Sequence, residues 1–195
     1  MSEISKATFT TQFLAETAAI LAAIDVDEVE RVAIGLAALK RRGGRLFILG
    51  VGGSAGHAGH AVNDFRKICG IEAYAPTDNV SELTARANDD GWETTFSGWL
   101  RGSRLAPPDA LLVFSVGGGD LDKGVSTNIV RAVELAKSVR ASVFGIVGRD
   151  GGFTRRSADA SVLVPALFPE HITPQTEGVC AVLWHLLVTH PVLQR

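Results

Sequence analysis

The segment Arg45–Asp64, RLFILGVGGSAGHAGHAVND, decides the fold, because its pattern changes abruptly in the middle. The run LFIL that begins at Leu46 is continuously apolar, as in a strand whose two faces are both covered. Glycines then end the run, and Ser54 is predicted to cap a helix that begins directly after it. This order of strand, glycine turn and helix N-terminus is typical of an anion or phosphate site, because backbone N–H groups and the helix dipole both face the ligand.

Two other interpretations of this turn stay open. A dinucleotide-binding turn has the pattern G-x-G-x-x-G, which the segment from Gly50 to Gly56 matches only loosely. A tight turn that binds no ligand is the second alternative. The histidines and the aspartate of the following helix favour a functional site.

The rest of the chain repeats the alternation of strand and helix. Apolar runs at 71–75, 110–115, 141–147 and 160–165 predict four more strands, and helical patterns separate them. The run at 110–115 also ends in glycines, and Ser126 begins the next helix, so a second strand, glycine loop and helix N-terminus follow the first. Strands alternating with helices predict an α/β fold: a three-layer αβα sandwich with a right-handed parallel sheet of about five strands.

Two helical patterns precede the first strand, at 8–24 and directly after Asp25. We expect a single domain over residues 1–195, with residues 1–43 forming an N-terminal helical hairpin and residues 44–195 forming the α/β core. Because the hairpin lies outside the main alternation, it is a natural oligomerisation element. Covering one face of the sheet is an equally good interpretation of these helices.

Composition excludes several classes of protein. The 195 residues carry a formal net charge of −2 and no basic run, which argues against a nucleic-acid partner. No apolar stretch approaches the roughly 20 residues of a membrane span. The first residues are polar and lack the apolar region of a secretory signal, and Cys69 and Cys180 have the surroundings of buried free thiols. We therefore expect a cytoplasmic protein without a membrane or nucleic-acid partner.

Two pairs of residues have side chains that bind metals. His60 and Asp64 lie four apart on the helix after the first glycine turn and so share one face. Glu177 and His185 lie eight apart on the last predicted helix. Imidazole and carboxylate are ordinary ligands of zinc, so the four residues predict a site for a divalent metal. On spacing alone, a capped helix with solvated histidine and aspartate is at least as good an explanation.

Several separate motifs, in the same order, resemble those of the sugar isomerase (SIS) superfamily, and within it those of the phosphoheptose isomerases. These motifs are the two N-terminal helices, G-V-G-G-S with His60 and Asp64, the segment NDDGW at 88–92, which is expected to form a polar turn, the loop after Ser115, GRDGG at 148–152, and His185. The resemblance covers nearly the whole chain. It implies the SIS fold and the conversion of sedoheptulose 7-phosphate into D-glycero-D-manno-heptose 7-phosphate.

The resemblance also implies the site residues. Substrate binding falls on Val51, Gly52, Gly53, Ser54, Asn88, Asp89, Ser115, Val116, Gly117, Ser126 and Glu177. Zinc is expected on His60, Asp64, Glu177 and His185, by analogy with the zinc enzymes of the family. Asp64 and His185 are the expected acid–base pair for proton transfer through a cis-enediol. Family members form homotetramers with sites at subunit contacts, which the resemblance extends to this chain.

Four departures from the family pattern bear on substrate and mechanism. Val51 stands where the family has asparagine, Asp64 where it has the longer glutamate, and Glu177 where it has glutamine. The serine- and threonine-rich phosphate loop is replaced by SVGGGD at 115–120, with an insertion that reaches Ser126. Lys123 is the nearest residue that can offset the charge of the loop's aspartate.

These departures keep two alternative functions open. The first is an isomerase of another sugar phosphate, which the altered loop suggests. The second is a non-enzymatic SIS scaffold, similar to the tetrameric relatives that bind a replication initiator protein. The presence of His60, an acid at position 64 and His185 favours the enzyme.

Overall fold

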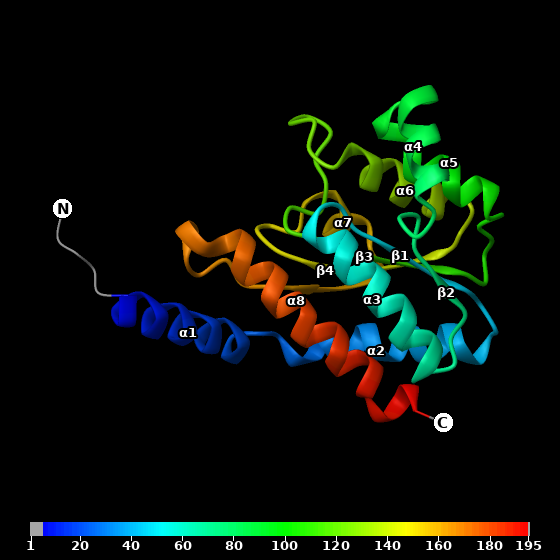
Figure 1. Cartoon of the computed structure of the whole chain (residues 1–195). Helices are drawn as coiled ribbons and strands as arrows, with labels where there is room; N and C mark the ends of the chain where they lie inside the picture. Colours follow the sequence, from blue (N-terminus) through cyan, green and yellow to red (C-terminus); the bar gives the residue numbers. More distant parts are fainter. Residues whose placement is uncertain (1–5, 195) are drawn as a thin grey trace.

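Five parallel strands form one sheet in the order β2-β1-β3-β4-β5 (Figure 1). The computed structural model describes residues 6–194. The strands are β1 (Leu46–Leu49), β2 (Ala73–Tyr74), β3 (Ala110–Ser115), β4 (Ser142–Val147) and β5 (Ala160–Leu163). The prediction of a parallel sheet with about five strands is confirmed, with a second strand that keeps only two of its five expected residues.

Helices cover both faces of this sheet. They are α1 (Lys6–Ala22), α2 (Val26–Arg41), α3 (Gly53–Lys67), α4 (Val80–Asp89), α5 (Thr95–Gly102), α6 (Thr127–Ser138), α7 (Gly152–Ser157) and α8 (Ile172–Thr189), with short 3₁₀ turns at Trp92–Thr94, Pro169–His171 and Pro191–Leu193. Alternate side chains of a strand point to opposite faces. Leu46 and Ile48 pack in the core under α2, α3 and α8, whereas Phe47 and Leu49 pack in the core under α5 and α6. The three-layer sandwich is therefore confirmed.

The two N-terminal helices differ in what they contact. Asp25 caps α2, since its carboxylate accepts the N–H groups of Asp27 and Glu28, and α2 then packs on the sheet next to β5. Helix α1 leads away from the sheet and contacts α8 (Figure 1). The structure thus contains both expected helices, and α2 is the one that covers the sheet. Within residues 6–194 no single helix meets the length and apolarity needed to cross a membrane; only α1 and α2 taken together, with a 67° bend, do so.

Two local predictions were wrong. Ser54 does not cap α3: it lies in the first turn of the helix, 5% exposed, and the N-cap is Gly52, whose φ of 63° suits glycine. Asn88 and Asp89 do not form a turn, because they continue α4 to its end. The chain turns immediately afterwards at Gly91, with φ 84°. In both places the break in the backbone falls on a glycine with positive φ instead of on the polar residue.

Candidate active site

A cavity of about 400 Å³ opens where β1, β3 and β4 end. Its walls come from the loops that follow these strands and from the start of α8: Val51, Ser54, Ser115, Val116, Gly117, Asp120, Lys123, Val125, Ser126, Arg149, Asp150, Thr173 and Glu177. Ligands of open parallel sheets bind beyond the carboxyl ends of the strands, and this cavity lies there. The two glycine loops predicted from the sequence therefore meet at one place.

Two helix N-termini border the cavity. Helix α3 begins after Gly52 and helix α6 after Ser126, and neither residue caps its helix with a side chain. The first N–H groups of a helix have no partner within the helix, so both termini offer donors to an anion. Ser126 has φ 50°, which is uncommon for a residue with a side chain. The hydroxyls of Ser54 and Ser126 line the same wall as these termini.

Close backbone packing fixes the glycine loop after β3. The hydroxyl of Ser115 accepts the N–H of Gly118 at 3.0 Å, and Thr154 donates its N–H and its hydroxyl to the carbonyl of Gly118 at 2.9 Å and 2.7 Å. A Cβ on Gly118 would lie 1.8 Å from the carbonyl oxygen of Gly151. The loop after β3 and the loop after β4 therefore touch at a distance that only glycine permits.

The inserted segment of the second loop forms a small hairpin. Asp120 and Val125 pair as an antiparallel bridge, and the ammonium of Lys123 lies 3.0 Å from the carboxylate of Asp120. The hydrogen bonds from Lys123 lower the pKa of Asp120, and the hydrogen bond to Asp120 raises the pKa of Lys123. Lys123 therefore offsets the charge of Asp120, as the sequence predicted, and stays a cation at the cavity.

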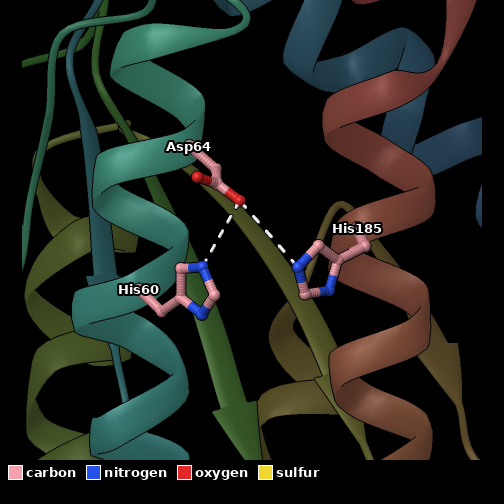
Figure 2. A group of neighbouring side chains, drawn as sticks. All are labelled: His60, Asp64 and His185. Carbon is pink, nitrogen blue, oxygen red and sulfur yellow. Dashed lines mark ion pairs between the residues drawn. The ribbon is translucent and has the colours of Figure 1, made fainter.

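A second cluster lies between α3 and α8. His60 and Asp64 project from α3 and His185 from α8, with the carboxylate between the two imidazoles (Figure 2). The Nε2 atoms of His60 and His185 lie 3.6 Å and 3.9 Å from Oδ2 of Asp64. The two imidazoles are about half exposed, whereas the Asp64 side chain is 13% exposed. One donor atom from each residue lies within 4.8 Å of the others, which is a suitable arrangement for a metal.

Neighbouring groups hold both imidazoles in place. Nδ1 of His185 lies 2.7 Å from the carbonyl oxygen of Ala181; because a carbonyl only accepts, Nδ1 carries the hydrogen and Nε2 keeps its lone pair for a ligand. The buried ring of Trp184 stacks on His185, with centroids 3.5 Å apart, and meets His60 edge-on at 4.7 Å. The amide of Asn63 donates to Oδ1 of Asp64 at 2.8 Å. The donor chemistry therefore fits a divalent metal such as zinc.

Comparison with known proteins identifies the family. No family model matches the chain. The sequence is 34% identical over 151 residues to a phosphoheptose isomerase of Trichlorobacter lovleyi, covering 74% of this chain and 71% of that protein. It is 32% identical to the phosphoheptose isomerase of Burkholderia pseudomallei, covering 95% of each chain. The chain belongs to the phosphoheptose isomerase family. It is therefore an enzyme, a sugar phosphate isomerase.

Solved structures agree with this assignment. The phosphoheptose isomerase of Neisseria gonorrhoeae superposes with a TM-score of 0.80 at 26% identity, covering 94% of this chain and 97% of that one. A phosphoheptose isomerase from Francisella tularensis superposes with a TM-score of 0.81 at 21% identity and covers 99% and 98%, which supports the fold. The expected SIS fold is thus confirmed.

The structure separates the residues that the family resemblance suggested. Seven of the expected substrate-binding residues line the cavity: Val51, Ser54, Ser115, Val116, Gly117, Ser126 and Glu177. Gly52 and Gly53 begin the adjoining helix, whereas Asn88 and Asp89 lie in α4, outside the cavity lining. Of the four expected metal ligands, three form the cluster, and Glu177 lies at the cavity instead.

Arg149 is a cavity residue that sequence reasoning missed. It follows β4, lines the cavity, and has φ 52°. The sequence contained a signal, because a basic residue two positions after the end of a strand, within the glycine-rich segment GRDGG, lies at the ligand edge of the sheet. Together Lys123 and Arg149 bring two cations to a cavity that also contains three carboxylates, of Asp120, Asp150 and Glu177.

Proposed function

We propose that this enzyme converts sedoheptulose 7-phosphate into D-glycero-D-manno-heptose 7-phosphate through a cis-enediol. The observation that carries the proposal is the cavity at the strand ends, where two uncapped helix N-termini meet Lys123 and Arg149. N–H donors and cations are the groups that bind a phosphate. The sugar then extends from the phosphate along α3 and α8 towards the His60–Asp64–His185 cluster.

The proposed cofactor is one zinc ion on His60, Asp64 and His185. The lone pair at Nε2 of His185 and the carboxylate between two imidazoles support this assignment. A divalent metal supplies Lewis-acid polarisation of the substrate oxygens next to the exchanging carbons. Three protein ligands leave coordination positions open, as in catalytic zinc sites.

Asp64 and His185 are the proposed acid–base pair that shares the proton transfer between C1 and C2. Isomerisation through a cis-enediol takes a proton from one carbon and returns it to the neighbouring carbon, so it needs a base near this proton and an acid near the carbonyl and hydroxyl oxygens. The two side chains come from different helices and face one another across 3.9 Å. Ala181 and Asn63 orient them through hydrogen bonds.

The proposed assembly is a homotetramer in the cytoplasm, with sites at subunit contacts. Exposed apolar side chains on the outer helices support an assembly, among them Leu14 and Leu21 of α1 and Val182 and Leu186 of α8. Residues of α1, α2 and α8 also line a shallow depression of about 250 Å³. Apolar side chains gathered on one side of a protein are typical of interfaces.

The test is an assay of the purified protein with sedoheptulose 7-phosphate, in which NMR follows the aldose product. We expect turnover that disappears after chelation and returns with zinc. Turnover that survives complete removal of metal would contradict the zinc assignment. The absence of product under every metal condition, followed by product from a C5 or C6 ketose phosphate, would contradict the substrate, and inactivity on the whole C5 to C7 panel would favour the scaffold alternative.

A further inference from the structure

The two imidazoles of the cluster differ in what orients them. Nδ1 of His185 lies 2.7 Å from the carbonyl oxygen of Ala181, so a hydrogen bond fixes the plane of that ring. Within residues 6–194, no hydrogen bond orients the imidazole of His60, whose side chain is 56% exposed and whose Nε2 lies 3.6 Å from the carboxylate of Asp64. A metal-binding histidine is normally oriented by a hydrogen bond from its other ring nitrogen. A different contact must therefore orient His60.

The indole of Trp184 supplies such a contact. It meets the His60 ring edge-on, with centroids 4.7 Å apart and an interplanar angle of 67°, and it stacks on the His185 ring at 3.5 Å and 28°. The two imidazoles also contact one another edge-on, with centroids 5.4 Å apart. Stacked and edge-on arrangements are the ones that aromatic rings prefer. One indole therefore touches a ring from α3 and a ring from α8 at the same time.

The indole is held much more firmly than the two imidazoles that it contacts. Trp184 is the largest fully buried side chain within residues 6–194, and it packs in the core beneath α3 and α8. The imidazoles of His60 and His185 are about half exposed. A side chain in a close-packed core keeps one orientation, whereas an exposed ring can turn. Trp184 is thus a fixed surface against which both imidazoles lie.

The indole N–H gives a second, independent reason to assign a role to Trp184. Within the part of the chain that the structure describes, its Nε1 atom is buried and has no hydrogen-bond partner. A buried donor without a partner is unfavourable, and phenylalanine or leucine would fill a core without leaving one. The indole is explained if this position needs a large flat ring face and not only apolar volume. The two imidazoles use that face.

We infer that Trp184 is a positioning residue of the active site, an inference that rests on the proposed function of the cluster. Its indole holds the imidazoles of His60 and His185 in the orientation in which both Nε2 atoms face Asp64 (Figure 2). Trp184 acts through these two rings and not on the substrate. Without the indole, the His60 ring turns freely, and the three donor atoms are together for a smaller share of the time. Contacts behind a metal ligand change metal affinity or activity by about 10- to 100-fold.

The test compares Trp184→Met with Trp99→Met, because methionine fills apolar space without a flat ring. Trp99 is the matched control: it is 9% exposed and packs edge-on against Phe47 at 5.5 Å, in the core on the other face of the sheet. We expect Trp184→Met to lower zinc affinity, measured by competition with a chelating dye, and kcat by about 10- to 100-fold each. KM and inhibition by inorganic phosphate should stay unchanged, because the cavity is untouched. Trp99→Met is expected to match the wild type in all four measurements.

Trp184→Phe separates the ring face from the volume, because phenylalanine keeps a ring at the same place. We expect its zinc affinity and kcat to lie within about threefold of the wild type, well inside the loss expected for methionine. Equal losses in the phenylalanine and methionine variants would overturn the inference, as would a folded Trp184→Met protein with the zinc affinity and kcat of the wild type. A loss of zinc affinity in Trp99→Met as large as in Trp184→Met would overturn it too.

A measurement without substrate separates this inference from the proposed function. Co²⁺ added to the metal-free wild type should quench tryptophan fluorescence, and most of this quenching should disappear in Trp184→Phe, which lacks the indole next to His185. A wild type that shows this quenching but does not isomerise sedoheptulose 7-phosphate would contradict the proposed substrate and support the position of Trp184 at the metal. A wild type that binds neither Zn²⁺ nor Co²⁺ would overturn the inference.

Discussion

The cavity and the His60–Asp64–His185 cluster are both built on α3 and α8, but from different parts of the chain. The cavity is made mostly of loops and helix N-termini, so backbone N–H groups held by close glycine packing join the side chains of Lys123 and Arg149 as its donors. The cluster is made of side chains on the faces of two helices (Figure 2). Binding in this fold therefore depends largely on backbone shape, whereas chemistry depends on a few replaceable side chains.

The largest expected effect comes from removing the imidazole of His185, which disturbs the cluster and leaves the cavity intact. His185→Ala should lower kcat by about 10³-fold, because it removes both a metal ligand and a proton carrier, while the cavity keeps its shape. Steady-state kinetics on sedoheptulose 7-phosphate measures the effect, and zinc per protein should fall as well. His57→Ala, on the same helix as His60 and outside the cluster, is the control. Near-wild-type turnover of His185→Ala would mean that the cluster takes no part in catalysis.

The second prediction tests the glycine packing of the cavity loops by adding a single side-chain atom at Gly152. In Gly152→Ala, the new Cβ would lie 2.2 Å from the carbonyl oxygen of Gly117, at a φ of 52°. We expect the free energy of unfolding to fall by about 3 kcal/mol, as a result of strain and overpacking against backbone. Urea unfolding measures this loss.

Gly56→Ala is the matched control for that change. Gly56 lies inside α3, and a Cβ there would meet no atom within 4 Å. Alanine is the better helix former, so the free energy of unfolding should rise by about 0.5–1 kcal/mol. Equal losses in the two variants would show that the contact between the loops after β3 and β4 is not what makes Gly152 necessary.

The difference between backbone loops and helix-borne side chains also explains how much of the molecule could be predicted from its sequence. The strands β1 and β3 follow directly from continuous apolar runs, and their glycine endings predicted the cavity. Arg149 was missed because its positive φ depends on packing of the loop after β4 against the loop after β3. Asn88 and Asp89 were misplaced because local turn preference is weaker than the continuation of a helix to the next glycine.

Glu177 shows the limit of spacing arguments. Its distance of eight residues from His185 corresponds to roughly 12 Å along a helix, so the two could share one ligand only if Glu177 came from the first turn of the helix or the preceding loop. Whether it does so depends on how α8 lies against α3. In the structure Glu177 meets Gly53 at the start of α3, and His185 meets Asp64 eleven residues further on, so the two helices run side by side in the same direction. Tertiary packing therefore decided the place of Glu177.

The smallest expected effect concerns the start of α8, where α1 docks beside the cavity. Glu16 of α1 is 5% exposed; its carboxylate lies 2.6 Å from Nδ1 of His171, and the amide of Gln12 donates to it at 2.8 Å. The hydrogen bond with His171 holds the pKa of Glu16 below its ordinary value, although burial opposes this. A carboxyl with a lowered folded-state pKa stabilises the fold above its unfolded pKa, and this stability is lost as the pH falls through the folded pKa.

Glu16→Gln should therefore unfold at a lower urea concentration than the wild type at pH 7. This difference between the two proteins should disappear as the pH falls below the ordinary pKa of a glutamate side chain. The effect is expected to be small, because a single ion pair is involved and its imidazole partner, His171, is 21% exposed. Its metal content should stay at the wild-type level, since Glu16 lies outside the cluster. If the difference in unfolding urea concentration between Glu16→Gln and the wild type is constant from pH 7 to pH 3, Glu16 stabilises the fold by packing and not by its charge. The contact between α1 and α8 would then not depend on pH.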